Sequence, residues 1–180
     1  MPKSTSWSRG TLARAACILI FASGCGGGGG GGVVGSGNTD VAGQWAVLPV
    51  VTGDACAISG LLGFNAPATL SITQTGATLV VEQRAVQGSS AVIAGTGSVS
   101  GTLVSITYDY GHQIDLGGSD PCMVDIHLTV DGTVAGDRFD GVAGASTSYN
   151  GDNIATCSHF DGCSVSMSIG ATRCPATGCP

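Results

Sequence analysis

Apolar and polar side chains alternate residue by residue through Cys122-Met123-Val124-Asp125-Ile126-His127-Leu128-Thr129-Val130. Successive side chains of a β-strand point to opposite faces, so this segment has one apolar and one polar face. The same alternation runs through residues 103–110 and 164–169. A sheet with one dry face and one wet face is typical of antiparallel β-proteins. The segment and its two counterparts therefore predict an antiparallel sheet.

Short glycine turns separate the alternating segments. Residues 72–79 read as a hairpin that turns at Gly76, and residues 97–104 align with residues 132–139, each pair of strands meeting at a central glycine. Two-residue hairpin turns require a positive φ angle, which glycine adopts without steric cost. These segments predict consecutive hairpins, in which each strand pairs with the next one along the chain.

Residues 38–180 read as a single β domain. No long stretch follows the helical period, whereas valine, isoleucine and threonine recur in short runs between glycine, asparagine and aspartate. We expect an all-β fold: an antiparallel up-and-down meander of about eight strands that forms a small closed or partly open barrel with disulfide bonds. Closure would remove the exposed strand edges that promote aggregation.

The amino terminus has the features of an export signal. Residues 1–14 contain Lys3, Arg9 and Arg14 and no acid, and residues 15–22 form an apolar run. A basic start followed by a short apolar stretch is typical of secretory signal peptides. The run is far shorter than the roughly 20 apolar residues that a membrane-spanning helix needs. We therefore expect residues 1–24 to be a signal peptide.

The run ends in Ala22-Ser23-Gly24-Cys25, which resembles the lipobox of bacterial lipoproteins. The resemblance implies cleavage after Gly24 and lipidation of Cys25, which would anchor the chain in a lipid bilayer. The alternative is an ordinary signal peptide that contains a cysteine. Gly26 stands where many inner-membrane lipoproteins carry aspartate, so the resemblance favours the outer membrane of the cell envelope. Residues 25–37, which include an unbroken glycine run from Gly26 to Gly32, would then be a flexible tether.

Charge excludes several partners of the mature chain. Arg84, Arg138 and Arg173 are the only basic residues beyond Cys25, apart from histidines, whereas all the acidic residues lie there. Nucleic acids and anionic lipid headgroups are bound by clustered lysine and arginine, so we expect neither to be a partner. A cationic protein would be attracted to this acidic chain.

Six cysteines remain after Cys25: Cys56, Cys122, Cys157, Cys163, Cys174 and Cys179. An even number in an exported chain predicts three disulfides, for which 15 pairings are possible. We expect Cys56 to pair with Cys122 and the last four cysteines to pair among themselves.

Gly43-Gln44-Trp45 resembles the Gly-x-Trp opening of lipocalin-like barrels, in which the tryptophan packs across one barrel end. A core tryptophan on a first strand would explain the same residues. The resemblance implies a central pocket for a small apolar ligand. On this interpretation we expect the pocket to be lined by apolar strand faces that include Trp45, Val104, Ile106, Tyr108, Val124, Ile126 and Leu128.

Four polar clusters could carry chemistry, but each has a simpler structural explanation. Residues 157–163 hold two cysteines, a histidine and an aspartate that could ligate zinc, although a disulfide-closed loop is favoured in an oxidising compartment. Asp125 and His127 share a strand face and could act as an acid–base pair, but polar side chains are ordinary on the wet face of a sheet. Calcium could bind two groups of aspartates, which turn chemistry explains equally well: Asp131, Asp137 and Asp140, and Asp115 and Asp120.

Together these features predict an anchored lipoprotein that acts by binding, with no catalytic, metal or cofactor site. The preferred hypothesis is a barrel that binds a small apolar ligand. The alternative is a protein-interaction or envelope-structural module, for instance an inhibitor of a cationic hydrolase, with a filled core and an acidic working surface.

Overall fold

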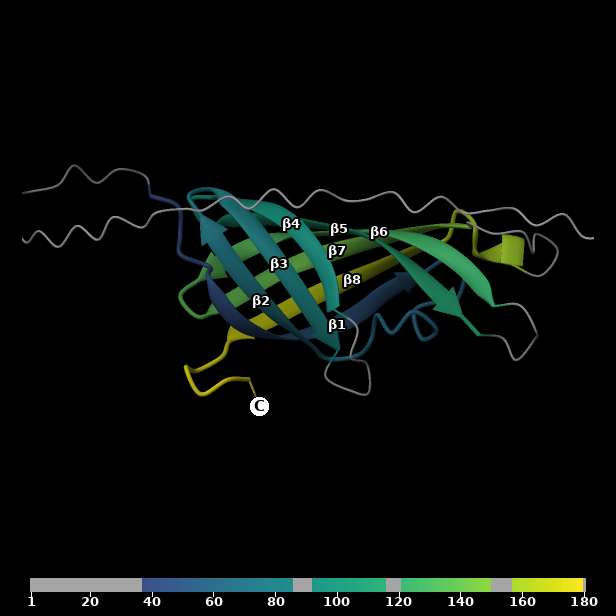
Figure 1. The fold of residues 1–180 in the computed structure, drawn as a ribbon, viewed down its shortest axis with the longest axis horizontal. Helices are drawn as coiled ribbons and strands as arrows, with labels where there is room; N and C mark the ends of the chain where they lie inside the picture. The colour runs from purple at the N-terminus through teal and green to yellow at the C-terminus, as the bar shows by residue number, and fades with distance from the viewer. Residues whose placement is uncertain (1–36, 86–91, 116–120, 150–156, 180) are drawn as a thin grey trace, which may run out of the picture. The chain divides into compact units, whose positions relative to one another are not determined.

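The computed structural model describes residues 37–85, 92–115, 121–149 and 157–179 (Figure 1). The chain divides into two compact units, residues 1–33 and 34–180, and all the described residues belong to the second. The signal peptide, Cys25 and the tether up to residue 36 lie outside the described residues, as does Asp120. Their assignments stay predictions.

In the described part of the chain, eight antiparallel strands follow one another around a closed barrel in sequence order (Figure 1). This arrangement confirms the predicted all-β meander of about eight strands and its closure. A single turn of 3-10 helix, η1 (Ser158–Phe160), precedes the last strand. No helix among the described residues is long and apolar enough to cross a membrane. The strands are β1 (Gly43–Asp54), β2 (Ala68–Thr75), β3 (Thr78–Ala85), β4 (Val92–Ser100), β5 (Leu103–Ile114), β6 (Cys122–Ala135), β7 (Arg138–Tyr149) and β8 (Ser164–Arg173).

The barrel closes because β1 pairs with strands on both of its sides. It pairs with β8 along its length, from Trp45 opposite Arg173 to Asp54 opposite Val165, with one irregularity between Val51 and Gly53. Its pairing with β2 covers only Gly43–Val47. The second half of β1 therefore lacks a β2 partner, and Pro49, which has no N–H to donate, lies in this half.

Three two-residue turns form one end of the barrel, here called the hairpin end. They join β2 to β3, β4 to β5 and β6 to β7, and in each the first turn residue is a glycine, Gly76, Gly101 or Gly136, with φ close to +60°. The residue after each glycine has a negative φ, which is the pattern of a type II′ turn. The predicted turn at Gly76 and the predicted equivalence of residues 97–104 and 132–139 are confirmed.

Inward and outward side chains follow the predicted alternation. In β6, Cys122, Val124, Ile126 and Leu128 are buried, whereas Met123, Asp125 and His127 are exposed. The buried side chains of all eight strands form one apolar cluster inside the barrel. The core thus lies on the interior face of the sheet.

The cysteine pairing differs from the expected one. Cys56 pairs with Cys163, Cys122 pairs with Cys157, and Cys174 pairs with Cys179. The expected Cys56–Cys122 bond is wrong, and of the last four cysteines only Cys174 and Cys179 pair with each other. The reason is topological: Asp54 and Val165 are register partners, so Cys56 and Cys163 lie just beyond the paired ends of β1 and β8.

The three disulfides should contribute unequally to stability. Replacing Cys56 and Cys163 together by serine should lower the free energy of unfolding by about 4–5 kcal/mol, since this bond closes a loop of 107 residues. The same double change at Cys174 and Cys179, which are separated by 5 residues, should cost about 2 kcal/mol. Urea unfolding of the oxidised variants measures both values. Equal losses would contradict a loop-length effect.

Candidate functional site

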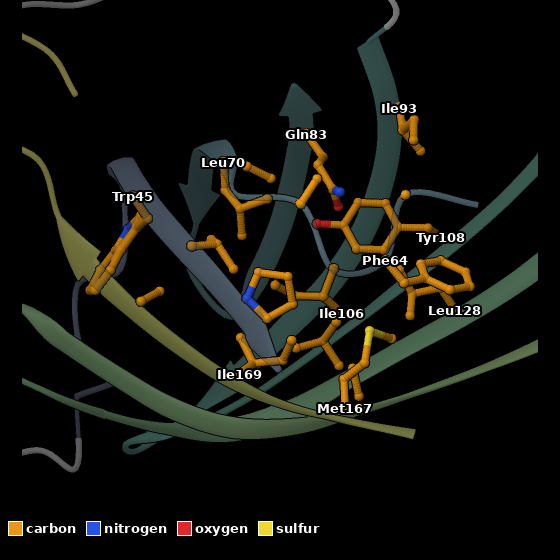
Figure 2. A pocket seen from close by; sticks show the side chains of 18 of the residues that line it. Trp45, Phe64, Leu70, Gln83, Ile93, Ile106, Tyr108, Leu128, Met167 and Ile169 are labelled. Carbon is orange, nitrogen blue, oxygen red and sulfur yellow. The ribbon is translucent and has the colours of Figure 1, made fainter. Parts of the chain in front are cut away.

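A largely apolar cavity of about 440 Å³ occupies the barrel interior. Its walls come from inward side chains of all eight strands and from the loop that joins β1 to β2. Figure 2 shows Trp45 on one side of this space and Phe64, Leu128 and Met167 on the other. Ligand pockets usually measure about 300–1,000 Å³, so the cavity is large enough for a small molecule.

Five of the seven residues expected to line a pocket do line this cavity: Trp45, Val104, Ile106, Tyr108 and Leu128. Val124 and Ile126 are buried in the core but do not belong to the lining. They lie further along β6, where Ile126 is the register partner of Thr147 on β7. The Thr147 hydroxyl donates a hydrogen bond to the carbonyl of Phe160, which holds η1 over this part of the sheet. These two side chains therefore pack in the core away from the cavity.

At the hairpin end, Trp45 is 2% exposed and closes the cavity. Its indole N–H donates to the carbonyl of Val41 at 2.9 Å. The Arg173 guanidinium lies 4.8 Å from the centre of a Trp45 ring, a cation–π contact, and donates to the carbonyls of Asp40 and Ala42. The arginine thus ties the segment before β1 to the last strand.

The chain before β1 is also tied to two hairpin turns. The Gln74 side chain accepts a hydrogen bond from the Val41 N–H and donates to the carbonyls of Thr39 and Gly76. On a neighbouring turn, the Gly101 carbonyl accepts from the Thr39 N–H. Val41 is 1% exposed, so these hydrogen bonds hold its apolar side chain in place at the hairpin end of the barrel.

The opposite end carries the loop between β1 and β2, residues 55–67, here called the lid. Its apolar side chains Ile58, Leu62 and Phe64 are buried, and Leu62 and Phe64 line the cavity. The Asp54 carboxylate accepts hydrogen bonds from the N–H groups of Ile58 and Ser59 at 3.0 and 2.8 Å. The bond from Ser59 is the largest cause of the lowered pKa of Asp54. The Cys56–Cys163 disulfide fixes the base of the lid to the residue before β8.

Two aromatic rings inside the barrel lie over glycines. A side chain at Gly95 on β4 would place its Cβ 2.5 Å from the Tyr108 ring, and one at Gly132 on β6 would place it 2.6 Å from the Phe139 ring. Both distances are shorter than any real contact, so each ring needs the glycine beneath it. The Tyr108 ring therefore lies flat across β4.

Four polar side chains interrupt the apolar lining: Gln83 on β3 and Tyr108, Tyr110 and His112 on β5. Burial raises the pKa of Tyr108 well above its ordinary value, with a smaller contribution from Tyr110, and raises the pKa of Tyr110 to about 12. Both phenols are therefore neutral hydrogen-bonding groups at physiological pH. The described lining contains no lysine, arginine, aspartate or glutamate.

The polar clusters singled out in the sequence lie elsewhere. Cys157 and Cys163 form disulfides with different partners, so their thiols are not available to hold zinc. No group of three or more histidine, cysteine, aspartate or glutamate side chains that could hold a metal occurs among the described residues. Of the calcium candidates, Asp140 forms an ion pair with Arg138, Asp137 forms one with Arg173, and Asp131 and Asp115 are exposed.

Asp125 and His127 lie on the exposed face of β6, as their spacing predicts. The His127 Nδ1 atom lies 2.7 Å from an oxygen of Asp109, its register partner on β5. Ser146 on β7 is the register partner of His127 on its other side. These residues form a polar row on the outer surface of the sheet, outside the cavity.

Sequence reasoning missed the lid, Arg173 and three of the four polar lining residues, Gln83, Tyr110 and His112. The lid has no periodic pattern, although its apolar residues Leu61, Leu62 and Phe64 among glycines were a signal that the loop packs inward. Gln83 and Tyr110 occupy inward positions of alternating strands, but their neighbours across the cavity follow only from the closed barrel.

Comparison of the chain with models of known protein families, with curated proteins and with solved structures finds no match.

The lid should loosen in acid through Asp54. A carboxyl group whose pKa is lowered by folding stabilises the fold above its unfolded value of about 4, and this contribution is lost as pH falls through the folded pKa. Below about pH 4 the amides of Ile58 and Ser59 should therefore lose protection against hydrogen exchange. Hydrogen-exchange rates of these two amides, corrected for the intrinsic effect of pH on exchange, measure this loss of protection.

Two variants test the assignment. Asp54→Asn should remove the acid-dependent step at the lid amides and lower their protection at neutral pH. Asp140→Asn changes another carboxyl group of lowered pKa, which Arg138 stabilises on the outer surface, and should leave the lid amides unchanged. An acid step that persists in Asp54→Asn would contradict the assignment.

Proposed function

We propose that this protein is an exported, lipid-anchored binding protein whose barrel holds a small apolar ligand. The observation that carries the binding proposal is the largely apolar cavity of about 440 Å³ inside the closed barrel. A module that acted only through its outer surface would be expected to have a filled core. Trp45 and Phe64 lie on opposite sides of the cavity, and the polar groups between them are few.

Export and anchoring are supported by separate observations. Three disulfides fit an oxidising compartment outside the cytoplasm. The Ala22-Ser23-Gly24-Cys25 motif supports lipidation of Cys25, and Gly26 supports retention in the outer membrane. Several acyl chains give stable anchoring, and a glycine-rich tether of about a dozen residues would leave the barrel roughly 20 Å of reach from the membrane surface.

Ligand binding can be tested with a neutral apolar fluorophore, N-phenylnaphthylamine. The oxidised full chain should bind one molecule saturably, with the increase in emission expected in an apolar site. Ile93→Trp, which enlarges an inward side chain of the lining on β4, should weaken binding at least tenfold by filling the cavity. Fluorescence titration measures the dissociation constants of the wild type and of Ile93→Trp.

A neighbouring residue supplies the matched control. Val92 precedes Ile93 on the same strand and is 42% exposed, so Val92→Trp should leave the affinity unchanged. Equal effects of the two variants, or no saturable binding by the wild type, would refute the proposal that the cavity holds the ligand.

Lipidation can be tested by mass spectrometry of the membrane fraction after expression in a Gram-negative bacterium. The amino-terminal peptide should begin at Cys25 and carry acyl chains. Cys25→Ala should abolish acylation and cleavage, whereas Cys17→Ala, a cysteine change within the leader, should not. A mature chain that carries an unmodified Cys25 would contradict anchoring.

A further inference from the structure

The Tyr108 hydroxyl is a buried hydrogen-bonding group without a partner among the described residues. Tyr108 is 1% exposed, and it belongs to the cavity lining. Figure 2 shows its oxygen directed into the pocket, toward the side where the Gln83 amide projects. A buried hydroxyl that lacks a partner costs free energy, so nearly all such groups in proteins are hydrogen-bonded.

The position of this hydroxyl is set by backbone geometry. Gly95 on β4 is the register partner of both Tyr108 on β5 and Val81 on β3. Because Gly95 has no side chain, the Tyr108 ring lies directly over it and its hydroxyl reaches toward β3. Gln83 is the next inward residue of β3, and its half-buried amide has no hydrogen bond within the described part of the chain. The Tyr108 hydroxyl, which can donate a hydrogen bond, and the Gln83 side-chain amide are thus held on neighbouring parts of the cavity wall.

The charge of the lining restricts what can meet these groups. Burial keeps the phenol protonated, because it raises the pKa of Tyr108, so the hydroxyl can donate a hydrogen bond at any physiological pH. The described lining holds no lysine or arginine to balance an anion and no carboxylate to balance a cation. An ion in the part of the cavity around Tyr108 would lose its hydration without meeting a lysine, an arginine or a carboxylate; His112, further along β5, is the one imidazole of the described lining.

We propose that the ligand is an uncharged, mainly apolar molecule that carries a hydrogen-bond acceptor such as a ketone, ester or amide carbonyl, and that this acceptor bonds the Tyr108 hydroxyl beside Gln83. This inference rests on the proposed function, because it names the class of ligand that the cavity takes. Tyr108 then favours those apolar molecules that carry a hydrogen-bond acceptor over those that carry none.

Three probes of similar shape test the proposal: methyl naphthyl ketone, ethylnaphthalene and naphthoate. The first has an uncharged acceptor, the second replaces the carbonyl by a methylene group, and the third is an anion. Equilibrium dialysis against the oxidised full chain should show the ketone binding about tenfold more tightly than ethylnaphthalene, as one buried hydrogen bond predicts. Naphthoate should bind more weakly than the ketone.

Tyr108→Phe should weaken binding of the ketone about tenfold and leave binding of ethylnaphthalene unchanged, because it removes only the hydroxyl. Its thermal midpoint should be equal to that of the wild type or higher, since no protein hydrogen bond is lost. Tyr149→Phe makes the same chemical change at a residue outside the described lining and should alter neither affinity.

The outcomes separate the two proposals. If the ketone and ethylnaphthalene bind equally and Tyr108→Phe changes neither affinity, an ordered water satisfies the hydroxyl; the inference is then wrong and the binding function stands. Tightest binding of naphthoate would also overturn the inference, in favour of an anionic ligand. If none of the probes and no N-phenylnaphthylamine binds, both the binding function and the inference fail.

Discussion

Pairing of β1 with both β2 and β8 is the constraint on which the rest of the structure depends. It joins the first and last strands and so closes the sheet into a barrel. The two sides of β1 are unequal, however, because pairing with β2 stops at Val47 while pairing with β8 continues to Asp54. The second half of β1 therefore departs from β2, and the lid covers the end of the barrel opposite the hairpin end with Ile58, Leu62 and Phe64. The Asp54 carboxylate and the Cys56–Cys163 disulfide both hold the lid at the point where β1 and β8 stop pairing.

Closure at eight strands also sets how the interior can be used. A barrel of this size is just wide enough to be filled by side chains or to hold one small ligand, so the size of the inward residues decides between the two. On β4, two small inward residues, Gly95 and Gly97, follow Ile93. The Tyr108 ring uses the space over Gly95, and a larger residue there would prevent the ring from lying across the strand. Glycine on one strand thus decides where the polar atom of a tyrosine on the next strand comes to lie.

The parts of the fold that depend on local sequence were predictable, and those that depend on closure were not. Alternation in residues 122–130 and the glycines at 76, 101 and 136 define strands and turns because both act within a few residues. Disulfide pairing depends on which connections between strands meet at the end of the barrel opposite the hairpin end. Cys56 lies beside Cys163 only because Asp54 and Val165 are register partners.

The cavity, too, depends on barrel closure and could not be predicted from local sequence alone. Alternation identified Val104, Ile106, Tyr108 and Leu128 as inward-facing, but it also selected Val124 and Ile126, which pack in the core outside the cavity. Only the closed barrel distinguishes an inward residue that lines the cavity from one that packs elsewhere in the core.

Selectivity in such a cavity follows from the cost of burying groups without partners. In the free protein the Tyr108 hydroxyl has no partner among the described residues, and a purely apolar ligand would leave it so, at a cost of about 1–3 kcal/mol. A ligand with an uncharged acceptor recovers that free energy, whereas an anion gains the same hydrogen bond but loses far more hydration than one neutral donor replaces. On the proposed function, the absence of lysine, arginine, aspartate and glutamate from the described lining would disfavour ions, and the Tyr108 hydroxyl would discriminate among neutral molecules. The Tyr108 ring packs against the backbone of Gly95, so the position of its hydroxyl depends on the absence of a side chain on β4.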